Sequence, residues 1–418
     1  MPRSRGARRA RGVWHLACLV RRSPGVMTRR LIVCFDGTWN TLEDRTNVAR
    51  LYAAVADAAA GCPEQRKFYD PGVGTTHGSR LTGGALGWGL DRNILEGFCW
   101  LINEYPAAPG LRPPAADGEV FADGPDIFVF GFSRGAYTAR SLAGLMNRCG
   151  LPRRGQFGDA AHPDSPLVRR AWQLYRASLP GGRDHPECVA FRRQHAWNVT
   201  VKCLGVWDTV GALGVPMLSN TPLSRLRYGF HDTRLGRIVE HAYHAVAIDE
   251  HREDYRPTLW DARHPVGTRE VEQRWFPGAH ANVGGGYEDD PLPAPPLAWM
   301  AQKALALGLE FTDEFAAALG RARCVAALPA SFALRGDEHL APVRDSYAEF
   351  LYGLYRLSRR LLLRGRYWRP MLRTGVGETV DETAWRRWRA DASYRPRNLA
   401  AAAREPAPAV AAASAEPA

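Results

Sequence analysis

The sequence predicts an α/β fold in which a mostly parallel β-sheet carries helices on both faces. Short apolar runs rich in β-branched and aromatic residues recur along the chain, as strands buried on both faces of a parallel sheet do. Helical patterns separate these runs, and alternation of strands with helices favours parallel pairing. Polar residues follow the strand ends, where ligands bind in such sheets. We therefore expect a site at the carboxyl edge of the sheet.

The elements follow in chain order. Strands are expected at residues 31–35, 67–69, 127–130, 199–207, 242–248 and 271–276. One helix is expected from a cap at Asn47 to Gly61, and another directly after residue 135. Further helices are expected over 90–106, 167–175, 297–309 and 347–363. The order of these elements places helices between successive strands.

Three connecting segments can be interpreted from their composition. Residues 71–89 are dense in glycine but contain no lysine, so they are interpreted as a mobile wall of a cleft and not as a phosphate-binding loop. Residues 110–124 predict a surface connection. Residues 151–187 are polar and contain prolines, which favours an insertion of the kind that forms a cap or lid.

The segment 347–363 mixes leucine and tyrosine with arginine. A basic amphipathic helix of this kind can lie on an anionic membrane surface, which gives a candidate peripheral membrane contact. The alternative, which we favour, is that its apolar face packs on the core while its arginines are solvated.

The length of 418 residues allows one large domain with additions. We expect a catalytic domain over residues 27–310, with a helical C-terminal extension over 311–399 packed on it. Residues 400–418, rich in alanine, proline and glutamate, predict a disordered tail. Residues 1–26 are interpreted as a basic leader that is disordered or, because Met27 leads straight into the first strand, not translated.

The net charge of +12 is a weak indication of a polyanion partner. Seven arginines lie in residues 1–26 without an acid, which leaves +5 for the rest of the chain. Apart from Lys67, Lys202 and Lys303 the basic residues are arginines, which suggests genomic base composition more than selection for phosphate contacts. Nucleic acid is therefore not expected as a partner.

The chain contains neither a convincing signal peptide nor an apolar run long enough to span a membrane. Its 8 cysteines are scattered without a C-x-x-C pair, which favours reduced, buried thiols. These features predict a cytoplasmic protein, with secretion by a signal-independent route as the alternative.

The residues that organise the chain are G-F-S-R-G, residues 131–135. This G-x-S-x-G pattern stands between a predicted strand and a predicted helix, which is the context of a nucleophile elbow. There a serine occupies a sharp turn, and glycines flank it because a Cβ would collide with the neighbouring backbone. The pattern predicts Ser133 as a nucleophile in an α/β-hydrolase fold.

Such hydrolases present their catalytic residues in the order serine, acid, histidine. Ser133, Asp208 and His280 satisfy this order, each just past a strand. Asp249 also follows a strand and is the alternative acid, although a salt bridge to Arg252 would be an adequate explanation of this residue. Asp208 is favoured because Thr209 and Gly211 predict a tight turn that can aim its carboxylate.

The negative oxygen of an acyl-transfer intermediate needs backbone N–H donors. Arg134, directly after the nucleophile, and the turn at Gly37 and Thr38 are the expected donors. No histidines and carboxylates have H-E-x-x-H spacing, so neither a metal nor another cofactor is expected.

Five segments resemble one known family: F-D-G-T-W-N (35–40), G-F-S-R-G-A-Y-T-A-R (131–140), G-V-W-D-T-V-G-A (205–212), A-I-D-E-H-R (247–252) and W-F-P-G-A-H-A-N-V-G-G-G-Y (275–287). They are similar to the catalytic domain of type VI secretion phospholipase effectors, the first lipase-effector class, formerly a domain of unknown function. The resemblance implies an α/β-hydrolase fold and serine phospholipase activity with Ser133, Asp208 and His280. It departs from the family at Asn282, where aspartate is usual.

The sequence therefore predicts a serine esterase that cleaves lipid esters, with phospholipase or lipase activity favoured. The alternative is a binding or regulatory protein on a hydrolase scaffold, because fold and motifs do not guarantee turnover.

Overall fold

A computed structural model describes residues 29–37, 40–56, 64–72, 85–105, 124–177, 182–211, 235–261, 268–314, 324–374 and 376–404. Its centre is a seven-stranded sheet in the order β2 (Gln65–Asp70), β1 (Arg30–Phe35), β3 (Asp126–Phe132), β6 (Val201–Trp207), β7 (His241–Ala247), β8 (Glu270–Phe276) and β11 (Glu378–Val380). Neighbouring strands run parallel. The predicted parallel α/β fold is confirmed.

The helices are α1 (Asn47–Ala54), α2 (Ala85–Glu104), α3 (Arg134–Cys149), α4 (Pro166–Arg176), α5 (Pro186–His195), α7 (His280–Gly284), α8 (Ala294–Ala306), α10 (Ser346–Glu349), α11 (Leu354–Leu361), α12 (Glu382–Ala390) and α13 (Arg397–Arg404). Short 3₁₀ helices include η4 (Glu253–Tyr255) and η7 (Phe350–Gly353). Two-residue strands pair as β4 (Leu151–Pro152) with β5 (Ala196–Trp197), and β9 (Phe311–Thr312) with β10 (Cys324–Val325).

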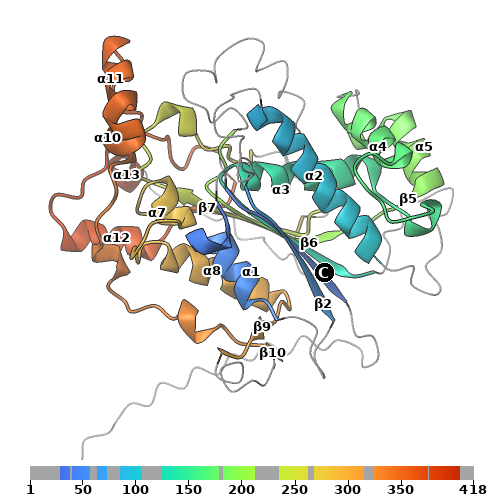
Figure 1. The fold of residues 1–418 in the computed structure, drawn as a ribbon. Coiled ribbons are helices and arrows are strands. Elements are labelled where there is room, and N and C mark those ends of the chain that lie inside the picture. Colours follow the sequence, from blue (N-terminus) through green and yellow to red (C-terminus); the bar gives the residue numbers. More distant parts are fainter. Residues whose placement is uncertain are drawn as a thin grey trace, which may run out of the picture.

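Side chains of the central strands alternate between two cores, because successive residues of a strand point to opposite faces. On β1, Leu31, Val33 and Phe35 join the core with α2, α3, α4 and α5, whereas Ile32 and Cys34 join the core with α1 and α8. Helices therefore cover both faces of the sheet (Figure 1). Helices α4 and α5, from the predicted cap insertion and just beyond it, belong to the same core as α3.

The C-terminal extension adds a strand that the sequence analysis did not predict. Strand β11 pairs with β8, and Met371, Ala384, Tyr394 and Leu399 form a third core with Val246, Ile248 and Trp275 of the sheet edge. Three residues with a glutamate and a threonine have no alternating apolar pattern, so pairing and not composition makes this segment a strand.

Several boundaries differ from the prediction. Helix α1 is capped by Thr46, whose side chain accepts from Ala49 N, and it ends at Ala54, while Gly61 lies outside the described residues. Helix α2 begins at Ala85, within the predicted loop 71–89, of which residues 73–84 are not described. Each glycine in its first turns costs only about 1 kcal/mol, which packing on the sheet offsets.

The tail prediction was wrong in its first residues, because α13 continues to Arg404. Its Leu399 is fully buried in the third core, which explains why the helix persists. Residues 1–28 and 405–418 lie outside the described part, and so does most of the connection 110–124.

The single helix predicted over 347–363 was also wrong. Tyr352 and Gly353 have φ of 54° and 85°, so the chain breaks there between α10 and α11. Left-handed backbone at two successive residues is incompatible with a continuous helix. In α11 the leucines are exposed and Arg359 is buried, so the favoured interpretation was wrong for these residues, whereas Arg356 and Arg360 are solvated as it expected.

The crossing from β3 to α3 is unusually close to β1. A Cβ on Gly131 would lie 2.4 Å from Gly135 O, and one on Gly135 would lie 2.2 Å from Phe35 O and 2.4 Å from Asp36 O. For Gly131 these contacts are with the backbone of α3, and for Gly135 they are with the backbone at the end of β1, and neither can move aside as a flexible side chain can. Glycine is therefore required at both positions around Ser133.

We expect Gly135→Ala to lower the free energy of unfolding by about 3 kcal/mol through overpacking. Gly155→Ala is the matched control, because a Cβ there meets nothing within 4 Å. Chemical denaturation of both variants measures the difference. Equal stabilities would show that α3 can shift away from β1 at no cost.

Candidate active site

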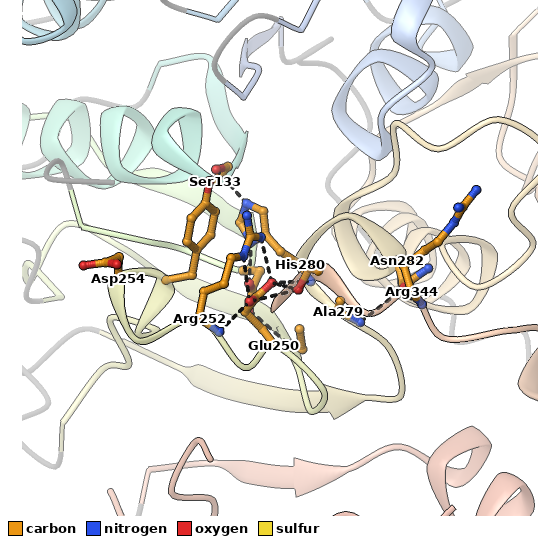
Figure 2. A network of polar contacts seen from close by, with 12 residues as sticks. Ser133, Glu250, Arg252, Asp254, Ala279, His280, Asn282 and Arg344 are labelled. Carbon is orange, nitrogen blue, oxygen red and sulfur yellow. Dashed lines mark hydrogen bonds and ion pairs between the residues drawn. The ribbon is translucent and has the colours of Figure 1, made fainter. Parts of the chain in front are cut away.

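The structure brings Ser133 and His280 into direct contact (Figure 2). The Oγ of Ser133 lies 2.7 Å from Nε2 of His280. Ser133 has φ 59° and ψ −121°, so it occupies a strained turn between β3 and α3. The distance permits a hydrogen bond in which the serine hydroxyl donates to a neutral imidazole.

The ring of His280 is held from two sides. The centroid of Phe132 lies 4.8 Å from that of His280, and the ring of Tyr255 lies nearly perpendicular to the imidazole, with its centroid 5.1 Å away. His280 begins the short helix α7, directly after the turn that follows β8. These contacts leave the imidazole little freedom to turn away from Ser133.

The other ring nitrogen of His280 reaches Asp208, the favoured acid. Its Nδ1 lies 2.5 Å from Oδ2 of Asp208, which follows β6 and is completely buried. Asp208 has φ 39°, a left-handed conformation that turns its side chain out of the strand direction. The next amide, Thr209 N, donates to Nε2 of buried His244 and fixes this turn.

Asp208 has a second partner that sequence reasoning missed. Nη1 of Arg369 lies 2.6 Å from Oδ1 of Asp208, and Nη2 lies 3.0 Å from Oδ2. The guanidinium also donates to Ala247 O and Tyr255 O. Arg369 belongs to the C-terminal extension, where arginines are so frequent that no sequence signal distinguishes it.

The protonation of Asp208 follows from competing effects. Burial raises the pKa of this carboxyl, but the Arg369 charge and the hydrogen bond with His280 lower it more, so the net pKa lies well below its ordinary value. The amide of Ala247 adds a donor at 3.0 Å. Asp208 is therefore an acceptor-only carboxylate facing Nδ1 of His280.

The alternative acid, Asp249, does not reach His280. It accepts from Gly278 N at 2.7 Å and from Tyr394 Oη at 2.8 Å, and burial raises its pKa. Its predicted pairing with Arg252 was wrong. Asp249 instead joins the turn after β8 to the C-terminal extension.

Arg252 pairs with Glu250. Its Nη2 lies 2.8 Å from Oε2 of this fully buried carboxylate, which also accepts from Ser346 Oγ and from the backbone N of His280 at 3.3 Å (Figure 2). Burial raises the pKa of Glu250, but the Arg252 charge lowers it more, to about 2. Because Arg252 also lies over the ring of Tyr255, at 3.5 Å from its centroid, this ion pair supports the residues around His280.

Asn282 has a structural role two residues after His280. Its Oδ1 accepts from Ala279 N and Arg344 N, and its Nδ2 donates to Asp290 at 2.7 Å (Figure 2). An aspartate here would place two carboxylates together without a donor between them. Asparagine therefore suits the neighbourhood of Asp290 in this chain.

The expected oxyanion donors are only partly in place. Arg134 N is the first amide of α3 and has no acceptor within the helix, as is general for helix N-termini. Gly37 N is already occupied, since it donates to Oδ1 of Asp36 at 2.6 Å. Burial raises the pKa of that carboxyl to about 6. Thr38 lies outside the described residues.

Two further findings concern the described residues alone. They contain no group of three or more His, Cys, Asp or Glu side chains placed to hold a metal ion. Among their helices, none combines the length and the apolar character that a membrane crossing requires.

The parallel sheet and the residues gathered at its carboxyl edge define the class of fold as α/β-hydrolase-like. Residues 29–303 match the family described as "T6SS, Phospholipase effector Tle1-like, catalytic domain". The chain belongs to this family. The match ends before Arg369, so the second partner of Asp208 comes from outside it.

Individual relatives are distant. An uncharacterised protein of Saccharomyces cerevisiae, YEL023C, is 27% identical over an alignment of 253 residues that covers 54% of this chain and 32% of the yeast protein. The crystal structure of an uncharacterised Pseudomonas aeruginosa protein has 18% identity and a TM-score of 0.37, covering 67% of this chain and 46% of that one. The Tle1 effector bound to the VgrG spike of the type 6 secretion system has 18% identity and a TM-score of 0.35, covering 63% and 52%.

We expect Arg369→Met to destabilise the protein by about 3–5 kcal/mol, because it leaves Asp208 as a buried charge without its cation. The ordinary pKa of Asp208 is 3.8, and its lowered value in the fold contributes stability that is present above that pH and lost as pH falls. Without Arg369, burial should raise the pKa of Asp208 above 3.8 in the fold, so the sign reverses: protonation of Asp208 then stabilises the variant, and its loss of stability on acidification becomes smaller than that of the wild type. Unfolding measured across acidic pH tests the shift.

Arg369→Lys keeps the charge and should retain part of the stability, with the acid transition between those of the other two proteins. Arg373→Met, at an exposed position four residues away, is the matched control and should behave as wild type. An Arg369→Met protein with wild-type stability and acid transition would contradict this account.

Proposed function

We propose that this protein is a serine hydrolase that cleaves carboxylic esters of lipids, with phospholipase-type substrates favoured. The observation that carries the proposal is the continuous contact from Ser133 Oγ to His280 Nε2 at 2.7 Å, and from His280 Nδ1 to Asp208 Oδ2 at 2.5 Å. Membership in a family of phospholipase effector catalytic domains supports lipids as the substrate class.

In the proposed reaction, Ser133 Oγ attacks the ester carbonyl carbon while His280 Nε2 takes the hydroxyl proton. Asp208 holds the imidazole in the tautomer that leaves Nε2 free to accept, and stabilises the imidazolium that forms. The tetrahedral intermediate then expels the alcohol, which takes the proton from Nε2. Water repeats the sequence on the acyl-serine and releases the fatty acid.

The negative oxygen of each intermediate would bind Arg134 N, at the positive end of α3. Gly37 N could serve as a second donor only after leaving Asp36 Oδ1. Because burial raises the pKa of Asp36 to about 6, its carboxyl is protonated more readily than an exposed one. Since Gly37 N is occupied, whereas Arg134 N has no acceptor within α3, we assign the principal oxyanion contact to Arg134 N.

Ser133→Ala should abolish ester hydrolysis, with a loss of 10⁴-fold or more as is general for such a residue, since one oxygen is removed from a turn that is already formed. Release of fatty acid from phospholipid and labelling by a fluorophosphonate probe measure the effect. Ser141→Ala, in the helix that follows Ser133, is the matched control, because Ser141 is buried with no hydrogen bond to its Oγ.

Activity that survives in Ser133→Ala would place the nucleophile elsewhere. If the wild-type protein is folded but is neither labelled nor active, the scaffold serves binding or regulation instead of catalysis.

The role of the acid is tested separately. Asp208→Asn should lower kcat by about 10⁴-fold, because the amide can hold His280 in the wrong tautomer. Asp249→Asn should lower the melting temperature through its bonds to Gly278 and Tyr394 while kcat per folded molecule is unchanged. Activity retained in Asp208→Asn and lost in a folded Asp249→Asn would transfer the role to Asp249.

A further inference from the structure

Helix α11 and the turn after it expose an unusual set of apolar side chains. We call them the leucine patch: Leu354 (63% exposed), Leu357 (54%), Leu361 (77%), Leu362 (65%) and Leu363 (96%). The helix projects from the body of the molecule beyond α10 (Figure 1). Since large apolar side chains gathered on one surface element mark an interaction site, the patch needs an occupant.

The leucine patch occupies one side of α11, and the other two sides carry a buried face and a basic face. At 100° per residue, Leu354, Leu357 and Leu361 share a face. Tyr355 and Arg359 are buried on a second face against the body of the protein. Arg356 and Arg360 lie four residues apart on a third, exposed face, and no carboxylate in the described part of the chain pairs with either.

The buried face fastens α11 to the candidate active site. Arg359 Nη2 lies 2.6 Å from Glu253, and Tyr355 Oη donates to Asp254 at 2.9 Å. The ring of the next residue, Tyr255, makes a T-shaped contact with that of His280. The helix that carries the exposed leucines is thus connected through η4 to Tyr255, which contacts the proposed general base.

The charges beside the patch decide between its two simplest occupants. In a symmetric pair of these chains, two copies of Arg356 and Arg360 would approach one another, and like charges oppose such an interface. The area that three leucines on a two-turn helix and two in the turn after it can bury is also small beside the roughly 1,000 Å² of a specific protein interface. An anionic lipid surface, in contrast, offers acyl chains to the leucines and phosphates to the arginines.

We propose that the leucine patch inserts into the surface of an anionic lipid bilayer, with Arg356 and Arg360 on the phosphate groups, and so presents the candidate active site to membrane lipid. The inference deepens the proposed function by naming a lipid surface as the place where the site meets its substrate. The inference rests on the proposed function only in saying what docking achieves. The binding to lipid itself needs no catalysis.

The test is co-sedimentation with vesicles, performed in the Ser133→Ala background so that lipid is not consumed. The vesicles are phosphatidylcholine alone or phosphatidylcholine mixed with phosphatidylglycerol. Replacing Leu354, Leu357 and Leu361 together by serine should weaken binding to the mixed vesicles roughly 100-fold. Replacing Arg356 and Arg360 by glutamine should weaken it roughly 25-fold, with little effect on pure phosphatidylcholine and a reduced dependence on salt.

Arg359 stays unchanged in these variants, because its ion pair with Glu253 is part of the fold. The matched control replaces Leu334 and Leu340, which are 48% and 57% exposed but lie outside the patch, by serine, and it should bind as the parent does. With Ser133 intact, all variants should hydrolyse a soluble short-chain ester at the wild-type rate, while the leucine variant loses activity on vesicles.

Two outcomes overturn the proposal: vesicle binding by the leucine variant that equals the parent's, or a parent dimer that this variant dissociates while vesicle binding is unaffected. A protein that binds vesicles through the patch but hydrolyses no ester overturns the proposed function and leaves the docking inference standing. Melting temperatures of all variants confirm that the comparison is between folded proteins.

Discussion

The structure around the candidate site depends on one buried arrangement of charges, in which Asp208 stands between Arg369 and His280. Arg369 and Asp208 are both fully inaccessible to solvent, so each pays a large desolvation cost that only its partners can offset. The bidentate contact does so, since the pKa of Asp208 lies below its ordinary value despite complete burial. Attraction therefore exceeds desolvation at this carboxylate.

The same guanidinium connects parts of the chain that are distant in sequence. By donating to Ala247 O and Tyr255 O, it joins the end of β7 to η4, and Tyr255 in turn borders the His280 ring. A second buried ion pair, Glu250 with Arg252, also contacts Tyr255, because the Arg252 guanidinium lies over the tyrosine ring. The imidazole is consequently held by charged networks that the sheet alone would not supply.

The sequence was sufficient where local pattern determines structure. The strands around the candidate site read as apolar runs, and the contact of Ser133, Asp208 and His280 was predicted from their order and from the strand ends that they follow. Glycines at 131 and 135 were predicted from sterics, and their neighbours lie where a Cβ would collide. The roles of these residues in catalysis remain a proposal.

Features that depend on distant pairing were not predictable in this way. Strand β11 has three residues without an apolar pattern, and Arg369 is one arginine among many, so nothing local marks either. The orientation of α11 depends on two left-handed residues, Tyr352 and Gly353, and on the pairing of Arg359 with Glu253 across more than 100 positions. An amphipathic pattern gives the faces of a helix but not which of them turns inward.

The place of Arg369 far after the other residues of the site has a consequence for biosynthesis. A ribosome delivers the serine, the aspartate and the histidine well before this arginine and before β11, the last strand of the sheet. During that interval the aspartate has no counter-ion for burial, and the edge of β8 has no neighbour. The nascent polypeptide therefore acquires its assembled site only after Arg369 and β11 have been translated, so a product terminated before them would carry all three residues without this arrangement.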